Sequence, residues 1–398
     1  MIMEQIVLID VTRLLLRIAK GKNATGVDRV TLAYITHFLP RAHAVISWKN
    51  KIIVLSKEDS LRLFEQFLNI CSIKVDKFSL YKLLKNLMVV PENVHNFKGC
   101  YYFNINHKGL ECEKYIKKIN KLGLRVIFFI HDLIPISHSE YCRPEEKEKH
   151  EQRMIRALQN ASGLLVNSQF THQQLCHFAS QHQLNIPPLE VAWLSCGLET
   201  SNIQYSKQGF FDQITDHYFV MLATIEPRKN HLTILNVWRR LVEKYGSEAP
   251  KLVIIGQRGW ECEQVIDLLD RCEELKHHVI EIADCDDNEI VYILKNARAL
   301  LFPSFVEGYG IPLVEALSLG VPVLASDIVV FREIAQEIPD WIDPIDALGW
   351  QQYIEQYMLQ DAKMRVEQLE RLKYYQHWQW SQHFYCVEKL IQSLERKS

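Results

Sequence analysis

The chain has 398 residues, with 46 Lys and Arg against 48 Asp and Glu, and a formal net charge of −2 at pH 7. A single hydrophobic core stops growing near about 250–300 residues, so this length predicts two domains. Hydrophobic residues make up 48% and charged residues 24%, which is an ordinary globular composition and excludes a disordered, collagen-like or coiled-coil chain. The near-neutral total also argues against a surface devoted to binding nucleic acid.

The cysteines and the first residues bear on the cellular compartment. No two of the ten cysteines have the two-residue gap of zinc ribbons and redox pairs, which is typical of reduced cytosolic proteins. Residues 1–10 combine a short apolar run with Glu4 and no cationic leader, so we expect neither a signal peptide nor a membrane anchor. We therefore expect a cytoplasmic protein, with a peripheral position at the inner face of the cytoplasmic membrane as an open alternative.

Short β-branched runs alternate with stretches of helical periodicity, which is the pattern of βα units and a parallel sheet. The predicted strands are residues 6–10, 125–130, 163–167, 218–223, 251–255, 279–282, 299–302 and 322–325. A Pro-Pro pair and the loss of any period within residues 187–216 predict a domain boundary. We expect an N-terminal α/β domain over residues 1–205, a C-terminal α/β domain over 206–372 and a terminal helix over 373–398 that crosses back to the N-terminal domain.

The densest polar motif follows the predicted strand 299–302. Glu307 and Glu315 stand eight positions apart, with Gly308, Gly310 and Pro312 between them. The pattern predicts a strand, a bare loop and a helix N-terminus that offers backbone N–H groups to an anion, with two carboxylates that accept hydrogen bonds from hydroxyls. Taken alone, a surface loop acid and a helix-dipole carboxylate would explain the two glutamates equally well.

Three further polar motifs follow predicted strands. Arg228-Lys229 offers a guanidinium fork and a point charge, which suit a diphosphate, although an isolated pair of this kind is more simply a solvated one. His131-Asp132 ends the apolar strand 125–130, and Gly26 lies in a glycine loop before the helix that follows the first strand. Parallel sheets bind ligands at the carboxyl ends of their strands, so all four motifs would converge on one cleft.

Together these residues resemble glycosyltransferase family 4, the retaining sugar-nucleotide transferases of the GT-B fold, in which two Rossmann-like domains with parallel sheets face a central cleft. The resemblance covers most of the chain, with supporting matches at residues 166–168 (Val-Asn-Ser), 256–260, 320–323 and 343–344. The tetrad Pro-Arg-Lys-Asn at residues 227–230 is similar to that of the bacterial O-antigen mannosyltransferase branch.

The resemblance implies a role for each motif. Glu307 would contact the donor-sugar hydroxyls, Glu315 the ribose hydroxyls, and Arg228 with Lys229 the diphosphate, while His131 would lie beside the reaction centre. The implied catalytic set is therefore His131, Glu307, Arg228 and Lys229. Donor contacts are also expected at Gly26, Gly256, Gly308, Tyr309, Gly310, Ile311 and Leu313. Many family members carry an arginine a few residues before the lysine, where this chain has residues 223–225, Ala-Thr-Ile, so Arg228 would supply the second positive charge.

The implied activity is metal-independent transfer of a sugar from a nucleotide-sugar donor to a growing glycan or lipid-linked acceptor, in the biosynthesis of O-antigen lipopolysaccharide or another cell-surface polysaccharide. The branch resemblance favours GDP-mannose over UDP- and dTDP-sugars. The alternative is a catalytically degenerate subunit of an assembly complex that binds nucleotide sugars without turnover. The presence of His131, Lys229, Glu307 and Glu315 together argues against it.

Two features carry a second interpretation. Asp284-Cys285-Asp286 matches the Asp-x-Asp pattern that holds a divalent metal in other glycosyltransferases. It precedes a predicted helix start, so Asp286 or Asp287 is more simply an N-cap, and no metal or other cofactor is expected.

Residues 74–125 carry eleven cations against four anions, and residues 81–88 are amphipathic at helical spacing. A solvated face explains this bias, and docking on an anionic membrane is the sharper hypothesis. The oligomeric state is left open.

Overall fold

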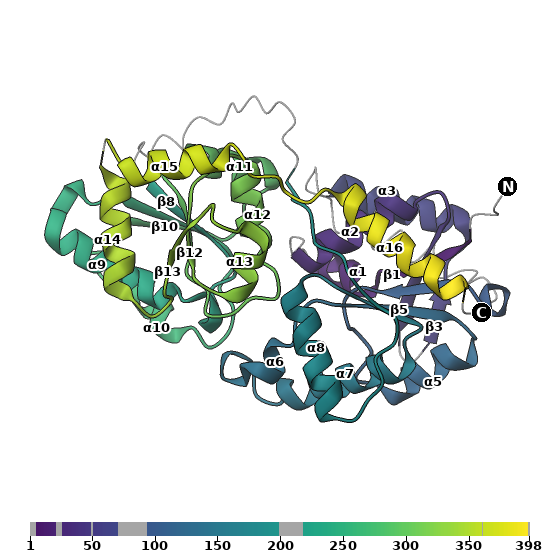
Figure 1. Cartoon of the computed structure of the whole chain (residues 1–398). Coiled ribbons are helices and arrows are strands. Elements are labelled where there is room, and N and C mark those ends of the chain that lie inside the picture. Colours follow the sequence, from purple (N-terminus) through teal and green to yellow (C-terminus); the bar gives the residue numbers. More distant parts are fainter. Residues whose placement is uncertain are drawn as a thin grey trace. The chain divides into compact units, whose positions relative to one another are not determined.

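The computed structural model describes residues 5–20, 26–48, 51–70, 94–198, 218–359 and 361–396. The chain divides into two compact units (Figure 1). The first unit contains Met1–Ser137, Pro144–Leu194 and Gln379–Ser398, and the second contains His138–Arg143 and Ser195–Trp378. The predicted boundary at residues 205 and 206 and the amphipathic stretch 81–88 lie outside the described residues.

The first unit is built on a seven-stranded sheet with the order β3-β2-β1-β4-β5-β6-β7. Its strands are β1 (Val7–Asp10), β2 (Ala42–Trp48), β3 (Lys51–Val54), β4 (Tyr101–Asn104), β5 (Arg125–Ile130), β6 (Gly163–Val166) and β7 (Leu189–Val191). All neighbouring strands are parallel except β2 and β3, which are antiparallel. The strand order reverses between β1 and β4, which makes that junction the switch point of the sheet.

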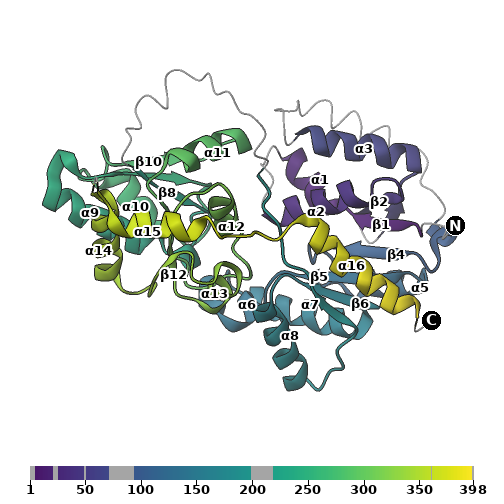
Figure 2. The same cartoon turned by 45° about the horizontal axis from the view of Figure 1, so that its top comes forward.

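Helices cover both faces of this first sheet. They are α1 (Thr12–Ala19), α2 (Gly26–Phe38), α3 (Lys57–Ile70), α5 (Glu113–Lys121), α6 (Ile134–Ser137), α7 (Glu146–Asn160), α8 (Gln169–Gln181) and α16 (Trp380–Glu395). Alternate residues of β5 point to opposite faces: Phe128 packs in a cluster with α5, α7 and α8, whereas Phe129 meets Tyr34 of α2 and His383 of α16. Figure 2 shows α16, in yellow, running across the strands of this unit.

The second unit is built on a six-stranded, fully parallel sheet with the order β10-β9-β8-β11-β12-β13. Its strands are β8 (Tyr218–Leu222), β9 (Lys251–Ile255), β10 (Val279–Ile282), β11 (Leu300–Phe302), β12 (Val323–Ser326) and β13 (Asp340–Ile342). In order along the chain this arrangement reads 3-2-1-4-5-6, the doubly wound order that binds ligands where the direction reverses. Here that switch point lies between β8 and β11.

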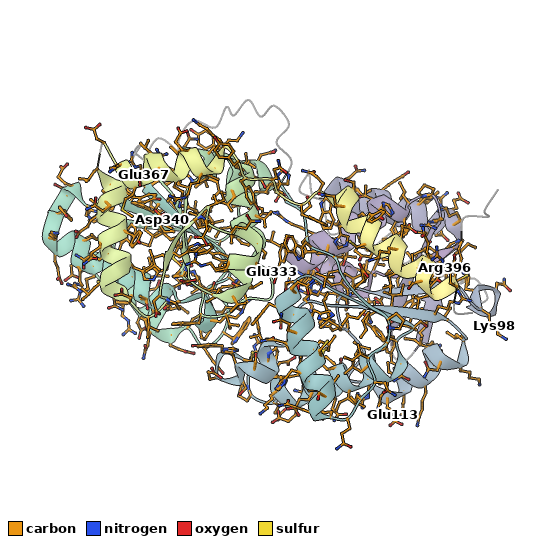
Figure 3. All side chains as sticks on the ribbon, in the orientation of Figure 1. Lys98, Glu113, Glu333, Asp340, Glu367 and Arg396 are labelled. Atoms are coloured by element: carbon orange, nitrogen blue, oxygen red, sulfur yellow. The ribbon has the colours of Figure 1, made fainter. Side chains whose placement is uncertain are left out.

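The helices of the second unit are α9 (His231–Tyr245), α10 (Glu263–Arg271), α11 (Asp287–Asn296), α12 (Ile311–Ser318), α13 (Val329–Ala335), α14 (Ala347–Met358) and α15 (Lys363–Leu372). Figure 1 shows α9 and α14 on one side of the sheet and α12 and α13 on the other. Because both faces are covered, the central strands β8, β11 and β12 are buried, mostly apolar runs. Charged side chains such as Lys98, Glu113 and Arg396 lie at the surface (Figure 3).

The prediction of two parallel-sheet α/β domains is confirmed. Each of the eight predicted strands is present, with ends that differ by at most one residue. Five strands, β2, β3, β4, β7 and β13, were not predicted, because they are short or carry polar residues that obscure the strand pattern. Of the two residues predicted as an N-cap, Asp286 and Asp287, it is Asp286 that caps α11, and it forms a capping box with Glu289.

The terminal helix differs from the prediction. It begins at Trp380 rather than at residue 373, and Tyr374 ahead of it is 82% exposed. Residues 373–379 therefore form a non-helical connection between α15 and α16. No helix in the described part of the chain is long and apolar enough to cross a membrane.

Candidate active site

The switch point of the second sheet brings two predicted motifs together. Arg228 and Lys229 lie in a 3-10 turn, Pro227–Lys229, after β8, and Glu307 lies in the loop after β11. The two strands are neighbours in the sheet, with Leu300 opposite Val220. Their loops therefore leave the carboxyl edge side by side. This is the position at which a doubly wound sheet holds its ligand.

Glu307 is the centre of a buried polar cluster. One carboxyl oxygen lies 2.6 Å from Nη1 of Arg228, and the other accepts hydrogen bonds from Nζ of Lys229 and, at 2.9 Å, from Oγ of Ser304. Arg228 also places Nη2 2.7 Å from a carboxyl oxygen of Glu226. The guanidinium thus bridges two carboxylates. Glu226, Glu307 and Lys229 are 4%, 6% and 8% exposed, so these charges interact with little screening by water.

The cluster shifts the pKa of its members in directions that follow from burial and charge. Burial by itself would raise the pKa of Glu307, but the charges and hydrogen bonds of Arg228 and Lys229 outweigh it and lower this pKa to about 2. The pKa of Lys229 is lowered, first by burial and then by Arg228. Burial raises the pKa of Glu226, against the pull of Arg228 and Lys229. At neutral pH Glu307 is therefore a carboxylate that accepts hydrogen bonds.

Hydrogen bonds to the main chain hold the loop after β8 against the loop after β11. The N–H of Phe305 donates to the carbonyl of Arg228 at 2.9 Å. Asn230, which adopts a left-handed conformation with φ of 58°, donates through Nδ2 to the carbonyls of Pro303 at 3.1 Å and Pro344 at 2.8 Å. Asn230 is 3% exposed, so these are buried hydrogen bonds that tie together the loops after β8, β11 and β13.

The loop that carries Glu307 leads directly into α12. Gly310 is the N-cap with φ of 114°, and a Cβ at this position would lie 2.7 Å from the ring of Phe331, so both the backbone and the space require glycine. Pro312 lies in the first turn, as predicted. Of the other predicted donor contacts on this segment, Gly308 and Tyr309 are buried in the loop, and Ile311, Leu313 and Glu315 lie on α12.

Two of these helix residues, Leu313 and Glu315, are buried. The side chain of Leu313 is fully buried, and its N–H donates to the carbonyl of Gly310 at 3.0 Å, so the residue serves the core and the helix start. Glu315 is 3% exposed and lies in the second turn of α12. Their expected contacts with a donor stay predictions.

Gly256 lets the loop after β9 approach the same edge. A Cβ at Gly256 would lie 1.9 Å from the carbonyl oxygen of Ala223, the residue that follows β8. The N–H of Ile225 then donates to the carbonyl of Gln257 at 3.0 Å. The glycine is therefore required by the close approach of two backbones, which supports the architecture of the site whether or not Gly256 touches a ligand.

The two predicted residues of the first unit lie at the carboxyl edge of its own sheet. His131 follows β5, is 9% exposed, and donates from Nε2 to the carbonyl of Ile105 at 2.6 Å. Burial is the main cause that lowers its pKa to about 4, so the ring is neutral at pH 7 and carries its lone pair on Nδ1. Gly26 begins α2, directly after residues that lie outside the described part. Asp28, two residues on, acts electrostatically on His131.

Sequence reasoning missed several residues of the second-unit site. Glu226 and Ser304 lie close to the predicted site residues in sequence, but the sequence pattern assigned no role to either of them. Tyr141 stacks on Phe305 with ring centroids 5.3 Å apart and an angle of 3°, and Arg143 lies 5.1 Å above the ring of Trp260. These contacts place the segment His138–Arg143, which is remote in sequence, in the second unit, and no local pattern could have revealed it.

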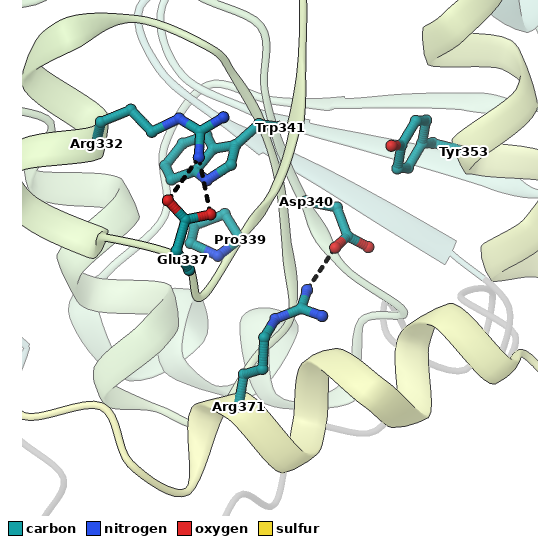
Figure 4. Close-up of a pocket in the computed structure, with 7 residues that line it drawn as sticks. All are labelled: Arg332, Glu337, Pro339, Asp340, Trp341, Tyr353 and Arg371. Atoms are coloured by element: carbon teal, nitrogen blue, oxygen red, sulfur yellow. Dashed lines mark hydrogen bonds and ion pairs between the residues drawn. The ribbon is translucent and has the colours of Figure 1, made fainter.

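A shallow pocket lies away from this site (Figure 4). It is lined by Arg332, Glu337, Asp340 and Arg371, among others. Asp340 begins β13, so the pocket lies at the amino edge of the second sheet, opposite the edge that carries Glu307. Its charges are internally paired: Arg332 lies 2.9 Å from Glu337, and Arg371 pairs with Asp340. None of the predicted site residues lines this pocket.

Among the residues that the structure describes, no group of three or more His, Cys, Asp or Glu side chains is arranged to hold a metal ion.

Two protein-family models match parts of this chain. Residues 206–376 match the family described as glycosyl transferases group 1, and residues 106–182 match the glucosyltransferase 3-like N-terminal domain. The chain is similar to O-antigen chain mannosyltransferase B of Escherichia coli, with 24% identity over 265 residues that cover 64% of this chain and 67% of that protein. It is also similar to O-antigen chain mannosyltransferase RfbU of Salmonella typhimurium, with 33% identity over 145 residues, 35% of this chain and 38% of that protein.

Other relatives are matched over a smaller share. The serotype-specific mannosyltransferase WbdA of Escherichia coli is 35% identical over 125 residues, which are 30% of this chain and 14% of that protein. Among solved structures, HepE of Anabaena in complex with UDP and glucose has a TM-score of 0.65 at 12% identity, over 98% of this chain and 100% of that one. Sucrose-phosphate synthase of Thermosynechococcus elongatus has a TM-score of 0.64 at 14% identity, over 99% and 100%. At these identities the likeness concerns the fold, and it confirms the predicted GT-B fold.

Proposed function

We propose that this chain, whose residues 206–376 match the family described as glycosyl transferases group 1, transfers mannose from GDP-mannose to a glycan or lipid-linked acceptor, with retention of configuration and without a metal. The biosynthesis of O-antigen or a related cell-surface polysaccharide is the proposed context, and it is motivated by the O-antigen mannosyltransferases among the relatives. The single observation that carries the proposal is the cluster of Arg228, Lys229 and Glu307 at the switch point of the second sheet.

The cluster has the chemistry that a sugar diphosphate requires. Arg228 and Lys229 are cations already oriented by Glu307, so they stabilise a developing diphosphate charge without reorganising when the bond breaks. The helix α12 begins at Ile311, four residues after Glu307, and its N-terminus adds a positive dipole end. The ionised carboxylate of Glu307 accepts hydrogen bonds from sugar hydroxyls, and Glu315 is proposed to accept those of the ribose.

The proposed reaction breaks the bond between the anomeric carbon and the phosphate oxygen, and the electron pair leaves with that oxygen. The acceptor hydroxyl forms the new bond on the same face of the sugar, and its proton passes to the departing phosphate. No covalent nucleophile of the protein is needed. The neutral ring of His131 would accept a hydrogen bond through Nδ1 beside the reaction centre. Gly26 is proposed to admit the phosphate or the acceptor.

The first unit is proposed to serve the acceptor and the second unit the donor, with cytoplasmic location. The basic bias of residues 74–125 motivates a further proposal, peripheral contact with an anionic membrane. Part of that segment, residues 71–93, lies outside the described residues. Sedimentation with phosphatidylcholine vesicles, with and without phosphatidylserine, tests the contact, and binding that does not increase with the anionic lipid would remove it.

A direct experiment tests the donor. Thermal unfolding is measured with GDP-mannose, UDP-glucose and dTDP-glucose at equal concentrations, because a ligand that binds the folded state raises the apparent stability. The solved complexes of HepE with UDP make UDP-glucose the main competitor. Stabilisation by GDP-mannose above the other two is expected. Equal shifts, or a larger shift with UDP-glucose, would overturn the choice of donor. A second assay measures the release of GDP. Release that requires added acceptor and continues in EDTA would distinguish a metal-independent enzyme from a binding subunit.

A further inference from the structure

The corner of the chain at His131 and Asp132 is held by side chains from two other elements. The corner follows β5, and β6 runs parallel beside it, with Ile130 opposite Val166. Asn167, the first residue after β6, therefore lies next to His131, although the two residues are 36 positions apart in sequence. Both are buried: Asn167 is 2% and His131 is 9% exposed.

The main-chain carbonyls of His131 and Asp132 each accept a hydrogen bond from a side chain. Nδ2 of Asn167 donates to the carbonyl oxygen of His131 at 2.8 Å. Nε2 of His150, on α7, donates to the carbonyl oxygen of Asp132 at 3.1 Å. Oδ1 of Asp132 accepts from the N–H of Ile134 at 3.0 Å, which closes the turn. The peptide groups on both sides of Asp132 therefore have defined directions.

The imidazole of His131 has a defined direction as well. Nε2 donates to the carbonyl of Ile105 at 2.6 Å, so one tautomer is selected and the lone pair stays on Nδ1. The ring lies 4.7 Å from that of Phe129 and 5.6 Å from that of His107, measured between centroids. A small rotation of the His131 peptide would misalign the bond to Ile105 and turn the lone pair away.

We propose that Asn167 is a positioning residue of the transferase: its amide fixes the peptide of His131 and, through it, the direction in which Nδ1 presents its lone pair to the substrate. The inference rests on the proposed function of His131. The proposal also gives a role to the Asn of the Val-Asn-Ser motif at residues 166–168, whose function the sequence pattern did not indicate. Misplacement of a catalytic group by about 1 Å can cost about 100-fold in rate, so a residue in this position acts on turnover without touching the substrate.

A second, longer contact reaches the same carbonyl, because Oγ1 of Thr171 lies 3.5 Å from the carbonyl oxygen of His131. Ser168, the N-cap of α8, is coupled to both donors: its Oγ donates to Oγ1 of Thr171 at 2.9 Å and to Oδ1 of Asn167 at 3.4 Å. The control therefore comes from another element of the same unit. Ser60 on α3 is fully buried, and its Oγ accepts from the N–H of Ala44 at 2.9 Å, so Ser60→Ala removes a buried hydrogen bond and controls for a loss of stability alone.

Steady-state kinetics with saturating acceptor provide the first test. For Asn167→Ala we expect kcat to fall at least tenfold while KM for the donor changes less than twofold, and for Ser60→Ala we expect both constants to stay within twofold. Asn167→Ser, which keeps a shorter donor, should recover part of the loss. Equal effects of the two alanine variants, or an unchanged kcat in Asn167→Ala, would overturn the proposal.

A second readout does not depend on turnover. Nitrogen NMR of the histidine side chains should report the Nε2–H tautomer at His131 in the wild type and in Ser60→Ala, and an averaged tautomer in Asn167→Ala. An unchanged tautomer in a folded Asn167→Ala would contradict the inference even if the chain transferred no sugar. Conversely, a shifted tautomer in a protein that lacks transferase activity would keep the positioning role and reject the proposed function.

Asn167→Asp supplies a third readout, and it covers the case in which Asn167→Ala does not fold. The new carboxylate would raise the pKa of His131, and the acid limb of kcat against pH should move to higher pH. Groups that already act on His131 electrostatically or through its ring are Asp132, Arg13, Asp28, His107 and His383. An acid limb that stays in place would count against the contact between Asn167 and His131.

Discussion

One carboxyl oxygen of Glu307 lies 2.6 Å from a guanidinium nitrogen of Arg228, although the two residues are 79 positions apart in sequence. The other oxygen accepts from Lys229, so one buried carboxylate orients both cations of the proposed diphosphate site. In the proposed function the cations act on the leaving group, and the carboxylate also accepts hydrogen bonds from sugar hydroxyls. Substitutions of its members should therefore differ in which kinetic constant they change.

Lys229→Ala should lower kcat by about 100- to 1,000-fold, because it removes a preorganised positive charge from the leaving diphosphate. Glu315→Ala should instead raise KM for the donor by about tenfold, because the proposed ribose contact is made equally in the ground state and the transition state. Initial rates over a range of donor concentrations separate the two effects. Kinetics indistinguishable from the wild type in both variants would reject the assigned roles.

Acid should destabilise the protein in two separate pH windows. The folded pKa of Glu307 is lowered to about 2 from a usual value of 4.5, so the stability that it contributes is complete above pH 4.5 and is lost as the pH falls towards 2. His131 and His383 have folded pKa values lowered to about 4, mainly by burial, so their contribution is complete above pH 6.5 and is lost as the pH falls towards 4. The first loss on acidification should therefore come from histidine.

His383→Gln tests the histidine window. His383 is buried and contacts the carbonyl of Trp193 at 3.0 Å and the hydroxyl of Tyr34 at 3.1 Å. Each histidine that is buried in the neutral form contributes a slope of up to about 1.4 kcal/mol per pH unit to the free energy of unfolding in this window. Denaturant unfolding between pH 7 and 4.5 should show a smaller slope in His383→Gln than in the wild type. His177→Gln, at an exposed position, should keep the wild-type slope.

Gly310→Ala should be more damaging than Gly320→Ala, although both glycines have a positive φ. A left-handed backbone costs about 1–2 kcal/mol for a residue with a side chain, which is the full expected cost at Gly320, where a Cβ meets nothing within 4 Å. At Gly310 a Cβ would also meet Phe331 at 2.7 Å, so the loop that carries Glu307 must move. Thermal unfolding with and without donor should show weaker donor binding only in Gly310→Ala, and equal behaviour of the two variants would count against this explanation.

Tyr141→Ala should loosen the loop that carries Glu307, because it removes the ring stacked on Phe305. An aromatic pair contributes about 0.5–1.5 kcal/mol beyond its buried area, so a modest loss of stability and a higher KM for the donor are expected. Tyr141→Phe keeps the stacked ring and should behave as the wild type. Should the phenylalanine variant lose as much as the alanine variant, the hydroxyl and not the stack would be the important group.

The sequence by itself determined the features that depend on neighbours along the chain. Apolar runs such as residues 251–255 and 279–282 matched their strands to the residue, and Asp286 matched its place as a cap. Cap and turn signals of this kind are local, because they depend on hydrogen bonds between residues a few positions apart. The same reasoning set the polar motifs at the ends of strands, which is where Lys229, Glu307 and His131 lie.

Only the tertiary structure decided which of these ends meet. The reversal of strand order between β8 and β11 puts Arg228 beside Glu307, and the pairing of β5 with β6 puts Asn167 beside His131. Nor does any local pattern assign His138–Arg143 to the second unit, because the rings that hold this segment come from the loops after β9 and β11. Strand order is set by packing over the whole core, so contacts that depend on it leave no trace at a fixed sequence spacing.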